Sequence, residues 1–148
     1  MELLNTTVEQ LRGLPDFDLC VEEFGAEASR VSAYGKVEPD FKAYETLESC
    51  GMLRLIAATE GGRLIGFASG FKVPSLHHPK SVLYLDCIFV RKSRRRGGPA
   101  LRLFRIMRSL AHQDGMIGLM AGAPSGSAAE RLFTAMGLQK IQTDFWAD

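Results

Sequence analysis

The sequence predicts one α/β domain with a mixed, mostly antiparallel central sheet flanked by helices. Between residues 53 and 90, apolar runs rich in β-branched and aromatic residues are separated by short turns, a pattern typical of hairpins. Before residue 50 and after residue 99, apolar residues instead recur at helical spacing. A chain of 148 residues suits a single domain over residues 1–148, with a substantial buried core.

Three helices are predicted before the first hairpin. Thr6 and Glu9 form a candidate capping box for a short first helix, and a second helix is expected from Asp16. Asp40 can cap a third helix over residues 41–50. Its inward positions are Phe41, Tyr44 and Leu47.

The remaining predicted elements are strands, where apolar residues alternate or form a short run, and helices, where they recur at helical spacing. The predicted strands cover residues 53–59, 64–73, 81–90, 116–121 and 138–146, and the predicted helices cover 99–114 and 128–136. The turn at Glu60–Arg63 contains two glycines, as a hairpin requires. This order of hairpins, then a helix, then strand–helix–strand favours a mixed sheet.

Composition excludes several classes of protein. Apolar residues make up 46% and charged residues 24%, so the chain is neither disordered nor of a membrane class. No apolar stretch reaches the ~20 residues that span a bilayer, and no secretory signal is apparent. Three widely spaced cysteines indicate reduced thiols in a cytoplasmic protein, and no disulfide framework or metal site is expected.

The net charge of +1 conceals an asymmetry. Residues 1–60 carry twelve acids and five bases, whereas residues 91–108 carry eight bases and no acid. A basic block can bind nucleic acid, bind a small polyanion, or simply solvate a helix face. Because it contains no interleaved aromatic pattern, nucleic-acid binding is the least favoured of these.

The basic block begins with a strand–glycine turn–helix sequence. An apolar strand ends at Val90, two glycines follow, and a helix begins at Pro99, which suits the first helical turn. Glycines allow close backbone approach, and free N–H groups at a helix start favour an anion. The loop lacks the Gly-Lys-Ser/Thr of a nucleoside-triphosphate loop and the Gly-x-Gly-x-x-Gly of a dinucleotide site.

Residues Arg95–Ala100 read Arg-x-x-Gly-x-Ala, five residues after the strand valine. This motif in this setting resembles the pyrophosphate loop of the GNAT superfamily, the Gcn5-related N-acetyltransferases. The resemblance covers roughly residues 45–140 and is sharpest over 83–104 and 128–138. The chain looks most similar to the small bacterial and phage-encoded members, and the resemblance implies a GNAT-like sheet.

The resemblance implies acetyl-CoA as co-substrate. Its pantetheine arm would lie along the strand ending at Val90, paired with exposed backbone groups of Ile88, Phe89 and Val90. The implied phosphate contacts are backbone groups of Arg95, Arg96, Gly97, Gly98 and Ala100, and Pro99 and Leu101 complete the implied cofactor-binding set. Pro99 departs from the pattern because it lacks an N–H, and the charges of Arg95 and Arg96 can compensate.

Asp86 is the leading candidate base for deprotonating an amine. Strand alternation predicts Tyr84, Asp86, Ile88 and Val90 on one face and Cys87 in the core on the other. An ordinary aspartate is a weak base near neutrality, so burial or a water relay is required. The alternative is that Asp86 pairs with an arginine or caps a loop.

Other catalytic candidates lie in loops. His78, with His77, precedes the same strand, and imidazole is a common proton acceptor in enzymes, although a His-His-Pro turn is more often only a turn. Phe133 stands where many GNAT members place a tyrosine that protonates the departing thiolate. Ser125, Ser127 or a water are the substitutes for that acid.

The sequence therefore predicts acetyl-CoA-dependent transfer of an acetyl group to a primary amine by direct attack. The alternative is a catalytically weak or inactive CoA-binding module of the same fold. Acidic residues before position 50 suit a cationic acceptor or solvate a helix face. The acceptor is not named by the sequence, no membrane partner is expected, and a homodimer is left open by the resemblance alone.

Overall fold

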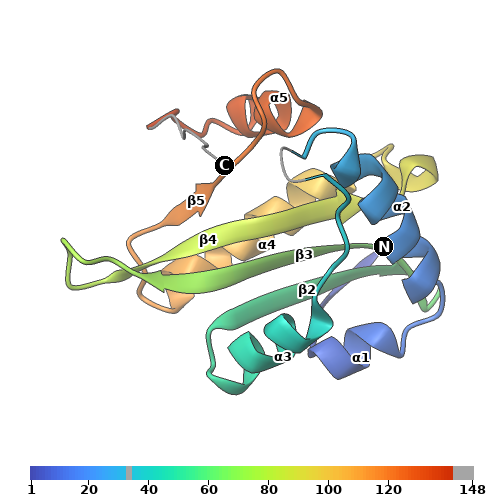
Figure 1. Cartoon of the computed structure of the whole chain (residues 1–148), viewed down its shortest axis with the longest axis horizontal. Helices are drawn as coiled ribbons and strands as arrows, with labels where there is room; N and C mark the ends of the chain where they lie inside the picture. Colours follow the sequence, from blue (N-terminus) through green and yellow to red (C-terminus); the bar gives the residue numbers. More distant parts are fainter. Residues whose placement is uncertain (33–34, 142–148) are drawn as a thin grey trace.

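The computed structural model describes residues 1–32 and 35–141, and its elements are drawn in Figure 1. In chain order they are β1 (Glu2–Asn5), α1 (Val8–Arg12), α2 (Phe17–Ser29), α3 (Phe41–Ser49), β2 (Leu53–Glu60), β3 (Arg63–Pro74), β4 (Ser81–Val90), the short 3₁₀ helix η1 (Lys92–Arg94), α4 (Pro99–Gln113), β5 (Leu119–Ala121) and α5 (Ala128–Ala135). The predicted helices and the three long strands are confirmed, with ends within one or two residues of the prediction.

The described strands form one sheet in the order β1-β2-β3-β4-β5. The first three pairings are antiparallel and the last, between β4 and β5, is parallel, which confirms a mixed and mostly antiparallel sheet. Helix α4 lies behind the sheet in Figure 1, and α1, α2 and α3 cover the front. Two apolar clusters result, one beneath α4 and one beneath the three N-terminal helices.

Helix α4 begins as the sequence predicts. Pro99 occupies its first turn, and Gly98 before it has φ 75°, a left-handed conformation that favours glycine. The inward stripe consists of Pro99, Leu103, Phe104, Met107 and Ala111. Because this stripe packs on β2, β3 and β4, the start of α4 is held at the end of β4.

The N-terminus differs from the prediction in two ways. Residues 2–5 form an unpredicted edge strand beside β2, because their two leucines are adjacent and give no alternating pattern. The capping box lies one residue later than expected, at Thr7 and Gln10. Thr6 is unavailable as the cap because its N–H donates to the carbonyl of Leu55 and extends the strand pairing.

The end of the chain is described only in part. Residues 138–141 are not in a strand, and the rest of the strand expected over 138–146 lies outside the described residues. No helix in the described ranges combines the length and apolarity needed to cross a membrane.

Candidate active site

Strand β4 continues to Val90, beyond the end of its parallel partner β5 at Ala121. The two strands pair only at Leu83–Leu85 and Leu119–Ala121, near the start of β4. Beyond Leu85, no described strand lies beside β4 on the β5 side. An opening beside β4, with no described strand across from it, therefore runs from Asp86 toward Val90 and the glycine loop, residues 95–98.

Backbone groups of β4 line this opening. The N–H of Arg91 donates to the carbonyl of Ile65 on β3, at 2.9 Å. Because antiparallel pairs alternate, the backbone of Phe89 also faces β3, whereas Ile88 and Val90 direct their N–H and C=O groups away from it. The N–H and C=O of Ile88 and the N–H of Val90 are thus placed to pair with an extended ligand, whereas the carbonyl of Val90 accepts from Arg95.

A β-bulge lies where the opening begins. Ser69 of β3 is opposite Cys87, but the next residue, Gly70, is opposite Leu85, so Asp86 is the extra residue. The bulge reverses the alternation predicted for this strand.

The side chains of β4 beyond the bulge consequently point to the opposite faces of the sheet from those that unbroken alternation would give. Cys87 and Phe89 belong to the cluster beneath α1–α3, and Val90 and Ile88 belong to the cluster beneath α4. The prediction that Asp86 shares a face with Ile88 and Val90, opposite Cys87, was wrong. Cys87 is nevertheless buried in the core, as expected.

Asp86 is held by two hydroxyl groups. Tyr44 of α3 donates to Asp86 Oδ2 at 2.5 Å, and Ser69 of β3 donates to the same oxygen at 2.8 Å. Asp86 Oδ1 accepts no hydrogen bond from the described residues. Asp86 is exposed, so the burial required of a lone aspartate base is not met, and a water relay is the remaining route.

The surroundings of Asp86 keep its neighbours protonated. Burial, reinforced by the charge of Asp86, raises the pKa of Tyr44, so its hydroxyl remains a donor to the carboxylate. Burial likewise raises the pKa of Cys87 well above its ordinary value. Cys87 is therefore a poor nucleophile near neutrality.

Sequence reasoning missed Tyr44 and Ser69 as partners of Asp86. A signal existed for each, because Tyr44 was expected on the inward side of its helix and Ser69 is a polar residue within an apolar strand. Their convergence on one carboxylate depends on the sheet register and on how α3 packs.

The glycine loop is open to a ligand. Gly97 and Gly98 have φ of 84° and 75°, and a Cβ at either position would meet no atom within 4 Å. No side-chain cap bonds to the start of α4. The N–H groups in the first turn of a helix have no partner within the helix. Those of Ala100 and Leu101 are therefore available to an anion, whereas Pro99 has no N–H group to offer.

Arg95 is committed to the protein itself. Its guanidinium forms a bidentate ion pair with Glu27 of α2, and Nε donates to the carbonyl of Val90 at 2.8 Å. The guanidinium also lies 5.9 Å from the ring centre of Phe89. Arg96 is exposed and, within residues 1–32 and 35–141, forms no ion pair, so it is the arginine of this loop that is free to meet a phosphate.

Of the eight bases in residues 91–108, three form ion pairs with described acids of residues 1–60. Hydrogen bonding by Arg95 lowers the pKa of Glu27, and hydrogen bonding by Arg63 lowers the pKa of Asp16. The pairs that join the loop region to acids are Arg91 with Asp16 and Glu23, Arg94 with Glu60, and Arg95 with Glu27. These acids stabilise the loop and are not available to a cationic acceptor.

Neither His78 nor Ser125, the catalytic candidates expected in loops, is brought to Asp86 by a side-chain contact. His78 lies in the β3–β4 hairpin, where its Nδ1 accepts from the N–H of Lys80. Ser81 follows, and five strand residues of ~3.3 Å separate it from Asp86, a span of roughly 17 Å. Ser125 is exposed in the loop after β5, and Ser127 caps α5 by accepting from the N–H of Glu130.

Phe133 of α5 is buried in the cluster beneath α4. Its ring packs against the core and offers no proton. The loop that precedes α5 leaves the sheet immediately after Ala121, the residue opposite Leu85, and therefore starts beside Asp86.

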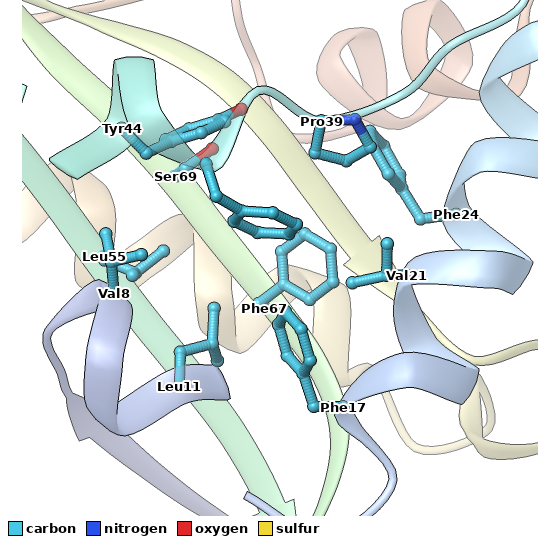
Figure 2. A pocket seen from close by; sticks show the side chains of 11 residues that line it. Val8, Leu11, Phe17, Val21, Phe24, Pro39, Tyr44, Leu55, Phe67 and Ser69 are labelled. Carbon is cyan, nitrogen blue, oxygen red and sulfur yellow. The ribbon is translucent and has the colours of Figure 1, made fainter. Parts of the chain in front are cut away.

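A pocket lies between α1–α3 and the sheet, with Tyr44 and Ser69 at one end (Figure 2). The cavity itself has a volume of about 30 Å³, room for one or two water molecules. The walls are Val8, Leu11, Phe17, Val21, Phe24, Pro39, Phe41, Tyr44, Leu55, Phe67 and Ser69. Apart from the hydroxyls of Tyr44 and Ser69, these side chains are apolar.

Comparison with solved structures supports the fold. An aminoglycoside acetyltransferase from an uncultured soil metagenomic sample aligns with TM-score 0.77 and 17% identity, covering 99% of this chain and 97% of that one. A ribosomal-protein-alanine N-acetyltransferase from Brucella melitensis biovar Abortus aligns with TM-score 0.75 and 17% identity, covering 100% and 99%. AAC(6')-Iy, in complex with a bisubstrate analogue, CoA-S-monomethyl-acetylneamine, aligns with TM-score 0.70 and 17% identity, covering 99% and 97%.

Comparison by sequence gives the family. No curated protein matches the chain. The model of the acetyltransferase (GNAT) family matches residues 20–138, which include α3, the opening beside β4, the glycine loop and most of α2. The chain therefore belongs to the acetyltransferase (GNAT) family.

Proposed function

We propose that the protein transfers an acetyl group from acetyl-CoA to a primary amine by direct attack. The observation that carries the proposal is the opening beside β4, where no described strand pairs beyond Leu85, between the exposed glycine loop and the exposed Asp86. Structural relatives are named for an aminoglycoside and for a ribosomal-protein alanine, and both kinds of acceptor present an amine.

The residues of the chain suit the two parts of CoA. The open edge offers the N–H and C=O of Ile88 and the N–H of Val90 to the amides of the pantetheine arm. Gly97, Gly98, Ala100 and Leu101 offer N–H groups to the pyrophosphate, and Arg96 offers charge. When bound, acetyl-CoA supplies the activated acetyl group; the chain orients it toward the bulge.

Asp86 is proposed to accept the proton of the amine through a water molecule. Lysine-type amines have a pKa of ~10.4, so the attacking nitrogen must first lose a proton. Tyr44 and Ser69 fix Oδ2, which leaves Oδ1 directed to solvent and able to hold that water. The hydroxyl donors are expected to orient the carboxylate, so Tyr44 and Ser69 are positioning residues.

The departing thiolate is expected to take its proton from water or from Ser125. Phe133 cannot donate a proton, and Ser127 is occupied as a helix cap. A thiolate whose thiol has a pKa near ~8.5 leaves without an obligatory acid. His78 is too distant in the hairpin to take this part without movement of the loop.

Two measurements test the proposal. Calorimetric titration should detect acetyl-CoA binding, and an absence of heat at millimolar ligand removes the proposal. Asp86→Asn should lower kcat by about 10²-fold or more while the Kd of acetyl-CoA changes little. Asp18→Asn, on the exposed face of α2, is the matched control and should leave both unchanged; equal turnover by the two variants eliminates Asp86 as the base.

A second candidate is a CoA-binding module without transferase activity, favoured by Phe133 in place of a tyrosine. It predicts that CoA raises the thermal midpoint of the protein while no amine releases free thiol. Turnover with any amine excludes it.

A further inference from the structure

Every exposed side chain of α4 is basic or polar. These residues, which we call the basic face, are Arg102, Arg105, Arg108, Ser109, His112 and Gln113. With 3.6 residues per turn they span an arc of about 140°, directly opposite the buried stripe of the helix. The face is roughly 16 Å long and points away from the sheet, whose other side is covered by α1–α3 (Figure 1).

No acid neutralises the basic face. The chain has no Asp or Glu from Cys87 to Gln113, and Asp114, which follows α4, pairs with Arg54 of β2. In the part of the chain that the structure describes, the three arginines of the face form no ion pair. They differ in this from the arginines within residues 91–95, which pair with acids on α2, on β2 and just before α2.

This arrangement of charge weakens the helix that carries it. Arg102 and Arg105, and likewise Arg105 and Arg108, are three positions apart, so like charges repel on one side of the helix. The dipole favours acids in the first turn, yet that turn contains none and Arg102 is the fourth residue. A face that had only to be solvated would be better served by mixed charges. The uniform charge therefore indicates a polyanionic partner.

The absence of exposed apolar and aromatic residues on α4 narrows the choice of polyanion. Protein interfaces have an apolar or aromatic centre, and helices that lie on a membrane insert apolar side chains into it. Single-stranded nucleic acids are held by bases stacked on aromatic rings.

A duplex requires no such stacking, because its bases are already stacked and its phosphates face outward. The lack of aromatic residues, which disfavours nucleic acid when only the sequence is considered, therefore does not apply to a duplex. Recognition of duplex RNA adds contacts to 2′-hydroxyl groups, whereas a row of guanidinium groups is matched to phosphates. Duplex DNA is the polyanion that fits the face best.

We propose that the basic face of α4 binds the phosphate backbone of double-stranded DNA without sequence specificity. Arg102, Arg105 and Arg108 make the contacts, each to one phosphate. Asp86 lies on the other side of the sheet, where it accepts from Tyr44 of α3, so a bound duplex leaves the proposed acceptor side uncovered. The proposal adds a partner and does not depend on acetyl transfer.

Fluorescence anisotropy with a labelled duplex of about 20 base pairs tests the proposal. For the unmodified protein we expect a Kd of roughly 10–100 µM at about 50 mM salt, and a slope of about −3 in log K against log salt because three phosphates are neutralised. The double variant Arg105→Gln/Arg108→Gln should have a slope of about −1 and bind about tenfold more weakly for each arginine removed. Its Kd for acetyl-CoA should not change. Absence of binding by the unmodified protein at roughly 500 µM overturns the proposal.

The matched control is Arg12→Gln/Arg30→Gln. It removes the same charge from α1 and from the end of α2, on the opposite side of the sheet, and should keep the slope of about −3. Equal weakening by the two double variants overturns the proposal, because net charge alone then accounts for the binding. Urea unfolding checks the fold of both variants, and Arg105→Gln/Arg108→Gln should be no less stable than the parent because it relieves repulsion.

Competition experiments test the choice of partner. Duplex RNA, single-stranded DNA and poly-glutamate should each displace the labelled duplex less effectively than unlabelled duplex DNA, and stronger displacement by any of them overturns the assignment to DNA. Saturating acetyl-CoA should leave the duplex bound; displacement assigns the arginines to the CoA site and overturns the proposal. A protein that acetylates amines but binds no duplex refutes this inference and leaves the proposed function intact.

Discussion

Gly66 is the position where one added methyl group should disturb both the fold and the ligand edge. It lies in β3 opposite Val90, buried between strands. A Cβ there would lie 2.4 Å from the carbonyl oxygen of Phe89 and 3.0 Å from Cα of Val90, which are backbone atoms that cannot rotate away. Relief requires β3 and β4 to separate at the end of the proposed pantetheine edge.

The cost of Gly66→Ala follows from three contributions. Overpacking of a buried site costs roughly 1–3 kcal/mol, and a weakened pair of ladder hydrogen bonds costs about 1 kcal/mol more. The lower entropy of the unfolded chain returns about 0.4–1 kcal/mol. We expect a net loss of about 1–3.5 kcal/mol in the free energy of unfolding, out of a total of roughly 5–15 kcal/mol.

Urea unfolding followed by circular dichroism measures this change. Gly118→Ala is the control, because its Cβ would meet no atom within 4 Å and its backbone is not left-handed. That variant should stay within about 0.5 kcal/mol of the parent or gain stability. A loss of less than about 0.5 kcal/mol for Gly66→Ala contradicts the close approach of β3 and β4 at this position. If the variant is destabilised as expected, the Kd of acetyl-CoA should also rise in the folded fraction.

Three further results are expected. A thiol reagent should label exposed Cys50 rapidly and reach the buried Cys20 and Cys87 only in denaturant. Burial also raises the pKa of Cys20 to about 11 and raises the pKa of Cys87, which slows their reaction further. Fast labelling of all three thiols contradicts the buried placement. A double-mutant cycle of Glu27→Gln and Arg95→Gln should give a coupling energy of about 0.2–1 kcal/mol in the free energy of unfolding. The coupling energy is small because both side chains are about half exposed. Strictly additive effects of the two substitutions contradict the ion pair. Because Arg95 lowers the pKa of Glu27, this stabilisation is present at neutral pH and lost as pH falls below about 4, so thermal midpoints of the parent and Glu27→Gln should converge there.

Local signals predict much of the molecule. Asp40 caps α3 as expected, β4 covers the predicted residues 81–90, and α4 begins at Pro99 after two glycines. Each of these depends on a few neighbouring residues: a capping side chain, a change of hydrophobic period, or a residue that permits positive φ. The glycine loop is predictable for the same reason, and with it the family.

Contacts between distant segments account for the differences. The bulge at Asp86 depends on the register between β3 and β4, so alternation within β4 alone places Ile88 and Val90 on the wrong face relative to Asp86. The charge of Arg95 is expected to compensate for Pro99 at a bound phosphate, but α2 brings Glu27 to its guanidinium across 68 positions.

Reading the chain in one dimension is enough to find the order of the elements, the glycine loop at the start of α4 and the carboxylate on the strand before it. Helix caps and hydrophobic periods act over a few residues, so each can be recognised from its neighbours. The two hydroxyls of Tyr44 and Ser69 on one oxygen of Asp86 become visible only when the chain is folded. Like the bulge and the ion pair between α2 and the loop, they arise from the packing of segments far apart in the chain, which no local pattern encodes.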